Sequence, residues 1–343
     1  MGVDLADLVA KEKTNLDELS GRSIAVDGYN SLYQFLAIIR GPTGEPLMDR
    51  QGRITSHLSG LLYRTTNMAE KGIKLAYVFD GTPPSLKEVE IRRRSKAKEE
   101  AVVRYEEALK RGDLPEAKKF AQATSRLKDL MVDDAKRLLD ALGVPWIQAP
   151  SEGEAQAAYI AKKGHVWAAA SQDYDSLLFG APRLVRNLAI GGRRKLPGRP
   201  TYVEVEPEFV ELSKVLSELG ITREQLIDLG ILVGTDYNPD GVKGVGPKTA
   251  LKMLKEHGSL DKILPNIQAE FPEDPHKIRQ IFLDPEVSDN YSIEWKEPKT
   301  DEVVQFLCKE RDFSEERVRN AVEKMIVGVR EREKKRTLDS FFR

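Results

Sequence analysis

The sequence predicts an α/β fold in which a mainly parallel central sheet is flanked by helices. The first observation is a set of short, near-continuous apolar runs at residues 24–26, 75–79, 146–149 and 166–170, which are typical of strands buried on both faces of a parallel sheet. The second is that helical segments such as residues 56–70 alternate with these runs. With 343 residues, the chain has room for one large domain or two smaller ones.

The N-terminal part follows this alternation in order. A strand at 24–26 leads to a helix that begins at residue 32, and a longer helix spans 56–70. The next strand, at 75–79, ends in an Asp-Gly-Thr-Pro-Pro turn at 80–84.

An insertion then separates two of the predicted strands. Residues 85–137 are polar, helical and dense in Lys, Arg and Glu. Because this segment is longer than a crossover needs, we expect helices that project over the edge of the sheet. The alternation returns at residues 138–205, the chain is mostly helical from residue 206, and residues from 328 onward form a charged run.

The composition indicates a soluble, globular protein. Charged residues make up 32% and hydrophobic residues 40% of the chain, and the net charge is −1. Cys308 is the single cysteine, which excludes an intrachain disulfide and favours an intracellular location. No signal peptide and no run of about 18 apolar residues is found, so we expect no membrane association.

Seven carboxylates lie just past the predicted strand ends or in adjacent loops. Ligands bind beyond the carboxyl ends of parallel strands, so these acids should meet at one edge. Unpaired buried charge is costly, and hard oxygen ligands suit Mg²⁺ or Mn²⁺. Two such ions would make a site for breaking phosphate esters. The seven residues are Asp27, Asp80, Glu152, Glu154, Asp173, Asp175 and Asp236.

Capping of helices is the alternative role for several of these acids. Asp27 or Asp80 alone could cap the helix that follows its strand, and Ser151 with Glu154 matches a capping box. The pair Asp173 and Asp175 favours the site instead. Residues two apart in an extended segment point the same way, so these two carboxylates should converge.

Two further motifs suggest contact with phosphate. Gly244, Gly246 and Lys248 open a helix at 250–257 in a helix-hairpin-helix pattern, in which glycines let backbone N–H groups approach a phosphate. An ordinary glycine turn is the alternative. Such contacts would bind the DNA backbone without reading its sequence.

The insertion carries the second motif. Lys87 and Arg94 are seven residues apart and share a helical face close after Asp80. Cations near a metal site can stabilise charge on a phosphoryl group. The alternative is a solvated face on which these cations pair with neighbouring glutamates.

Together these motifs resemble those of the flap endonucleases, which are structure-specific 5′ nucleases, in an archaeal form without the long basic tail of the eukaryotic enzymes. The resemblance covers the whole chain and rests on residues 77–84, 149–155, 168–175 and 234–248, with Asp27. It implies a saddle-like nuclease that cuts 5′ flaps at the junction of single strand and duplex in DNA replication and repair, with 5′–3′ exonuclease activity. It also implies that the seven acids hold two Mg²⁺ ions.

The resemblance implies roles for further residues. Lys87 and Arg94 match the family's basic pair at the base of a helical arch, and Tyr33 matches the aromatic that stacks on the nucleobase beside the scissile phosphate. A K⁺ ion at the carbonyls of the hairpin is implied as well. The family's 3′-flap pocket corresponds to Arg40, Thr55 and Arg311.

The C-terminus resembles a docking box for a sliding clamp of the proliferating cell nuclear antigen type. Residues 337–343 contain Leu338, Phe341 and Phe342, which a helical turn would bring to one side. The family's box has Gln three residues before the aliphatic position, where this chain has Lys335. Chance hydrophobicity at a frayed end is the alternative.

We therefore expect a monomeric, Mg²⁺-dependent nuclease. The rival functions are a single-strand ribonuclease of related fold, which has no use for the insertion, and a clamp-bound DNA adapter without catalysis, which has no use for the complete acid set. The expected regions are an N-terminal nuclease region at 1–98, a helical arch at 99–137 that begins near 85, an internal nuclease region with the hairpin at 138–258, C-terminal helices at 259–327 and a mobile tail at 328–343.

Overall fold

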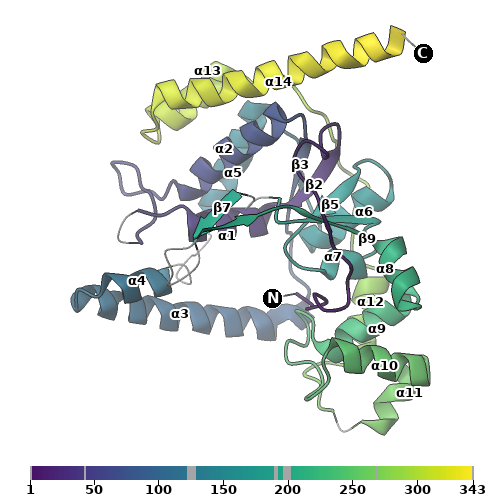
Figure 1. The fold of residues 1–343 in the computed structure, drawn as a ribbon. Coiled ribbons are helices and arrows are strands. Elements are labelled where there is room, and N and C mark those ends of the chain that lie inside the picture. The colour runs from purple at the N-terminus through teal and green to yellow at the C-terminus, as the bar shows by residue number, and fades with distance from the viewer. Residues whose placement is uncertain are drawn as a thin grey trace.

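The structure is a computed structural model, and it describes residues 2–41, 44–121, 129–188, 192–195, 202–267 and 269–341. Within these ranges the chain forms a central sheet with helices on both faces (Figure 1). None of the helices in the described part of the chain has the length and hydropathy needed to cross a lipid bilayer.

The described strands form one seven-stranded sheet in the order β1-β9-β6-β5-β2-β3-β4, and β7 pairs with β8 in a separate ribbon. Strands β2, β3, β4, β5 and β6 run parallel, while β9 and β1 continue the sheet antiparallel. This confirms the mainly parallel sheet. The strands are β1 Glu12–Lys13, β2 Ser23–Asp27, β3 Lys74–Phe79, β4 Trp146–Gln148, β5 Ala168–Ala170, β6 Arg183–Arg186, β7 Gly192–Lys195, β8 Tyr202–Val205 and β9 Glu208–Glu211.

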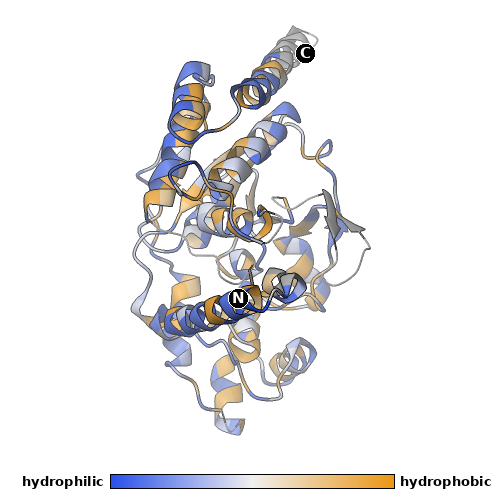
Figure 2. Ribbon diagram, turned by 90° about the vertical axis from the view of Figure 1, so that its left-hand side faces the viewer, coloured by the Kyte–Doolittle hydropathy of each residue, from blue (hydrophilic) through white to orange (hydrophobic). Residues whose placement is uncertain are grey.

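The two faces of the sheet bury two separate cores. In β2, Ala25 packs into one core while Ile24 and Val26 pack into the other, because successive side chains of a strand point to opposite faces. Helices α6, α7, α9, α10 and α12 line the first core, and α1, α2, α5 and α14 line the second. Figure 2 shows hydrophobic and hydrophilic residues mixed along these helices, as expected of elements with one buried side.

The helices have the following bounds: α1 Gly28–Ile38, α2 Ser56–Glu70, η1 Ser85–Lys87, α3 Glu88–Lys110, α4 Leu114–Ala121, α5 Asp129–Leu142, α6 Gly153–Lys162, α7 Asp175–Leu178, α8 Leu212–Leu219, α9 Arg223–Val233, α10 Pro247–His257, α11 Leu260–Ile263, η3 Leu264–Asn266, α12 Pro275–Leu283, α13 Thr300–Val304, η4 Gln305–Lys309 and α14 Glu315–Phe341.

The insertion forms a helical arm. Helices α3 and α4 pack against each other and extend away from the sheet (Figure 1). Helix α5 lies in the range predicted for the arch, but it packs into the second core through buried residues such as Leu138 and Leu139. Its apolar residues recur at helical spacing, and this pattern outweighs the charge of the surrounding segment.

The C-terminal helix runs into the segment predicted to be a mobile tail. The backbone of α14 is helical through Phe341, and the mobility of residues 328–343 stays a prediction. Residues 328–337 are rich in Arg, Lys and Glu, which are strong helix formers and pair at helical spacings. Phe342, one of the predicted clamp contacts, lies outside the described residues, as does Arg343.

Candidate active site

The carboxyl ends of four neighbouring parallel strands carry most of the predicted acids. Strands β5, β2, β3 and β4 are adjacent in the sheet, and each is followed within five residues by at least one of them. Asp236 arrives from the loop after α9. Acids that are far apart in the sequence therefore gather at one edge of the sheet: Asp173 and Asp175 after β5, Asp27 at the end of β2, Asp80 after β3, and Glu152 and Glu154 after β4.

Backbone amides fix three of these carboxylates, Asp27, Asp80 and Asp175. Asp27 accepts a hydrogen bond from the N–H of Asn30 at 2.9 Å and caps α1. Asp80 accepts one from the N–H of Gly153 at 2.6 Å. These hydrogen bonds do not exclude a metal site, since each carboxylate has a second oxygen.

The predicted capping box at α6 is not formed. Glu152 is the residue that precedes α6, and its side chain makes no cap hydrogen bond. Glu154 instead accepts a hydrogen bond from the hydroxyl of Ser176 at 3.3 Å, across to α7. Both glutamates are thus available to the cluster and not committed to the helix end.

Asp173 and Asp175 converge, but not for the predicted reason. Asp175 is the first residue of α7 and Asp173 lies in a bend, so the extended geometry predicted for this segment is wrong. The N-terminal segment brings them together. A Cβ on Gly2 would lie 2.6 Å from Cβ of Asp173 and 2.8 Å from Cγ of Asp175, and the N–H of Val3 donates to Asp175 at 2.7 Å.

Burial and mutual repulsion raise the pKa values of one part of the cluster. Burial together with Asp80 raises the pKa of Asp27 to about 8, and burial together with Asp236 raises the pKa of Asp175 to about 7. The pKa of Glu154 is raised well above its ordinary value by burial and by Asp175. In the absence of cations these carboxyls therefore retain protons near neutral pH.

Two cations at the base of the arm pair with two other acids of the cluster. Nζ of Lys87 lies 2.6 Å from Glu152 and 3.1 Å from Asp236, and Nη2 of Arg94 lies 2.5 Å from Asp236. Burial opposes ionisation of Asp236, but Lys87 and Arg94 outweigh it and hold the pKa of this carboxyl at about 2. The predicted basic pair thus lies among the predicted acids.

The donors suit divalent ions in their chemistry. They are carboxylate oxygens, which Mg²⁺ and Mn²⁺ prefer, and dications would relieve the repulsion that raises the pKa values. As the side chains stand, however, no three acid, His or Cys groups among the described residues are spaced to hold an ion. Binding of ions would therefore require loss of protons from Asp27 and Asp175 and release of Glu152 and Asp236 from Lys87 and Arg94.

The predicted hairpin forms an open helix N-terminus. Gly244 has φ +79, a left-handed conformation that favours glycine. Gly246 precedes α10, and a Cβ placed on it would meet no atom within 4 Å. Lys248 lies exposed in the first turn. The hairpin therefore exposes backbone that a phosphate could approach, and phosphate binding there stays a prediction.

Tyr33 lies on α1, facing the arm. Nζ of Lys98, on α3, is 4.3 Å from the centre of the Tyr33 ring. The ring is only partly buried, so the face that Lys98 covers would become available if the arm moved.

The residues predicted for a 3′-flap pocket are held by the protein itself. Arg311 forms hydrogen bonds of 2.9 Å to both carboxylate oxygens of Asp134. Arg40 donates to the backbone carbonyls of Leu36 and Gly44. Thr55 is buried at the start of α2.

The same region exposes apolar side chains that the sequence analysis missed. Ile38 at the end of α1 is 53% exposed, and Leu47 and Met48 between α1 and α2 are 38% and 52% exposed. Large apolar groups in contact with solvent often mark interaction surfaces. Their irregular spacing gave no periodic signal.

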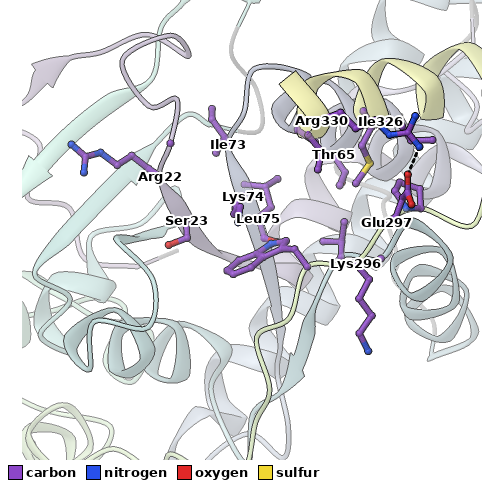
Figure 3. Close-up of a pocket in the computed structure, with 18 residues that line it drawn as sticks. Arg22, Ser23, Thr65, Ile73, Lys74, Leu75, Lys296, Glu297, Ile326 and Arg330 are labelled. Carbon is purple, nitrogen blue, oxygen red and sulfur yellow. Dashed lines mark hydrogen bonds and ion pairs between the residues drawn. The ribbon is translucent and has the colours of Figure 1, made fainter. Parts of the chain in front are cut away.

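A separate cavity lies at the amino ends of the strands, away from the acid cluster at their carboxyl ends (Figure 3). It has a volume of about 1120 Å³ and is lined by Ser23 and Lys74, the first residues of β2 and β3, and by Trp295 and Ile326. Because it lies at the amino ends of these strands, it is distinct from the acid cluster.

Comparison with known proteins identifies the family. The XPG N-terminal domain matches residues 1–101 and the XPG I-region matches residues 143–236. Flap endonuclease 1 of Hyperthermus butylicus is 59% identical over 335 residues, which are 96% of each chain, and that of Pyrococcus abyssi is 53% identical over 342 residues, 100% of this chain and 98% of the other. The chain belongs to the flap endonuclease family. The resemblance inferred from the motifs is thereby confirmed.

Solved structures agree with this assignment. Flap endonuclease-1 from Methanococcus jannaschii superposes with a TM-score of 0.76 at 42% identity, covering 96% of this chain and 100% of that one. The catalytic core of Rad2 in complex with DNA substrate shares the fold, with a TM-score of 0.70 at 23% identity over 95% of this chain and 100% of the other. The flap endonuclease fold therefore extends over nearly the whole chain.

Proposed function

We propose that this flap endonuclease hydrolyses the phosphodiester at the junction of a 5′ flap and duplex DNA, using two Mg²⁺ ions held by the seven carboxylates. The observation that carries the proposal is the cluster at one sheet edge, where burial and then mutual repulsion raise the pKa of Asp27 to about 8 and of Asp175 to about 7. Mutual repulsion between buried acids is costly to fold stability, and it is expected where the cluster serves to bind cations.

The bound ions would supply Lewis-acid stabilisation of the reacting phosphate and activation of the attacking water. The carboxylates on β2, β3 and the loops after β4 and β5 would hold them. Mn²⁺ has the same ligand preference and is expected to substitute.

Lys87 and Arg94 would act on the phosphate. In the free protein they neutralise Glu152 and Asp236. With ions on the carboxylates, Lys87 would lose Glu152 and Asp236 and Arg94 would lose Asp236, and the scissile phosphate would offer both cations a new anion. Their N–H groups would then donate to its oxygens and stabilise the charge that develops there.

Other elements would place the DNA. The hairpin before α10 would bind duplex phosphates irrespective of sequence, with K⁺ at its carbonyls. Tyr33 would stack on the nucleobase beside the scissile bond, and the arm would admit a single strand but exclude duplex. Cleavage from a free 5′ end would give the 5′–3′ exonuclease activity.

The proposal extends to partners and context. The enzyme would act as a monomer in DNA replication and repair, inside the cell where its substrate lies. A sliding clamp would bind residues 337–343, of which Leu338 and Phe341 belong to the last turns of α14. Arg40, Thr55 and Arg311 would border the 3′ flap once DNA displaces their present partners.

The direct test uses a labelled double-flap DNA, a single-stranded RNA and a blunt duplex, each with Mg²⁺ or with EDTA. We expect incision at the flap junction only when Mg²⁺ is present. Preferential cleavage of the RNA would support a ribonuclease instead. Tight flap binding without cleavage at any Mg²⁺ or Mn²⁺ concentration would support the adapter function.

A further inference from the structure

Glu90 is a buried acid on a largely solvated helix. It lies in the first turn of α3 and is only 7% exposed, whereas Glu88, Glu99 and Glu100 on the same helix are exposed. Burying a carboxylate is costly unless it is paired. The surroundings of Glu90 therefore have to compensate for its burial.

The partner of Glu90 is Arg94, one helical turn away. Oε1 of Glu90 accepts a hydrogen bond of 2.7 Å from Nε of Arg94. On its other edge, the same guanidinium donates from Nη2 to Asp236 at 2.5 Å. The guanidinium group is planar, so a hydrogen bond at Nε fixes the directions of the remaining N–H groups.

A neighbouring pair provides the comparison. Arg92 and Glu88 have the same four-residue spacing and lie 3.2 Å apart, but their side chains are 82% and 62% exposed. Exposed pairs of this kind contribute little to stability, because water and salt screen them. The side chain of Glu90 is 9% exposed and that of Arg94 is 40% exposed, so water competes little for the carboxylate of Glu90.

We propose that Glu90 is a positioning residue that orients Arg94 toward the scissile phosphate. Glu90 holds the Nε edge, and the Nη2 edge is then free to exchange Asp236 for a phosphate oxygen without reorientation of the guanidinium. Glu90 itself touches neither the phosphate nor the ions. This inference rests on the proposed function, in which Arg94 contacts the reacting phosphate.

The test is a double-mutant cycle on single-turnover cleavage of flapped DNA by the full-length enzyme. Glu90→Ala should slow the step on the order of tenfold, a usual coupling for residues in contact, with flap affinity unchanged. Glu90→Gln keeps an acceptor at Oε1 and should recover most of the rate. In the Arg94→Ala background, Glu90→Ala should have no further effect, and Glu88→Ala is the matched control with an unchanged rate.

A second readout does not use activity. In the DNA-free protein, the NMR signal of the Arg94 Nε–H should exchange slowly with solvent in the wild type and in Glu90→Gln, and fast in Glu90→Ala. If the Ala variant does not fold, Glu90→Met, which has a similar length but no carboxylate acceptor, takes its place in the wild-type and Arg94→Lys backgrounds. Because lysine has no Nε–H, Glu90→Met should slow cleavage in the wild type and have no such effect in Arg94→Lys.

Two results would overturn the inference. The first is an equal slowing by Glu90→Ala in the wild-type and Arg94→Ala backgrounds, since Glu90 would then act independently of Arg94. The second is a loss of thermal stability and flap affinity with an unchanged cleavage rate, which would make the pair structural. Failure of the proposed function appears separately, as absent cleavage by the wild-type reference.

Discussion

Replacing Asp175 with Asn should inactivate the enzyme and at the same time stabilise the metal-free protein. Asp175 is buried, and its pKa is raised from 3.8 to about 7 by burial and by Asp236. The amide oxygen of Asn can still accept the 2.7 Å hydrogen bond from the N–H of Val3. The change therefore removes a charge while keeping shape and contact.

The magnitude follows from the pKa shift. A raised carboxyl pKa means that the folded state binds the proton more tightly, so this contribution to stability is present below pH 3.8 and is lost as the pH rises through 7. The shift of about three units corresponds to about 4 kcal/mol at pH 8. Asn cannot ionise, so in EDTA the variant should exceed the wild type by up to about 4 kcal/mol at pH 8 and by about 2 kcal/mol at pH 5.

The assay is denaturant unfolding in EDTA at both pH values, repeated at pH 8 with Mg²⁺. Ligands that bind only the folded state stabilise it, so Mg²⁺ should raise the stability of the wild type and have little effect on Asp175→Asn. Cleavage should fall by about a hundredfold or more, with flap binding largely retained. A variant less stable than the wild type in EDTA at pH 8 would show that the Asp175 carboxylate supports the fold, and the reasoning would be refuted.

The remaining predictions concern four other parts of the chain. Lys87→Ala and Arg94→Ala should each slow single-turnover cleavage by about a hundredfold; a loss of affinity alone would make them ordinary phosphate contacts. Gly246→Val should weaken duplex binding at every sequence, because the site accepts a Cβ in the free protein but its branches would block a phosphate; calorimetric loss of Mg²⁺ binding would show the hairpin to be misassigned. Burial lowers the pKa of His57 to about 4, so the stability that the neutral imidazole contributes is present above pH 6.5 and is lost as the pH falls toward 4. His57→Leu should therefore reduce the difference in unfolding free energy between pH 7.5 and pH 5. An unchanged difference would contradict this. Deleting residues 337–343 should abolish clamp binding and clamp-stimulated cleavage but preserve basal cleavage, and a collapse of basal cleavage would assign the segment to the fold.

The parts of the fold that depend on local pattern were predictable from the sequence. The run at 75–79 is apolar on every residue, and β3 is buried on both faces. Helix α2 was predicted at 56–70, which are its observed bounds. The antiparallel edge formed by β9 and β1 was not predicted, because edge pairing depends on partners nearly 200 residues apart and leaves no periodic signal.

The candidate site likewise has a part that the sequence predicts and a part that it does not. Its acids could be found because the ends of parallel strands meet at one edge by geometry. The pairing of Lys87 with Glu152 and of Arg94 with Asp236 joins residues 65 and 142 positions apart, and no local pattern encodes such contacts. The convergence of Asp173 and Asp175 was predicted from an extended segment, while the structure achieves it by packing both against Gly2.

The most direct test of the central claim is anomalous diffraction from crystals of the protein soaked in Mn²⁺. Two peaks about 3.5–4 Å apart are predicted at the carboxyl ends of β2, β3, β4 and β5, with Lys87 and Arg94 displaced from Glu152 and Asp236. No peak at this edge, or manganese bound only elsewhere, would contradict the assignment of the seven carboxylates as ligands of two ions.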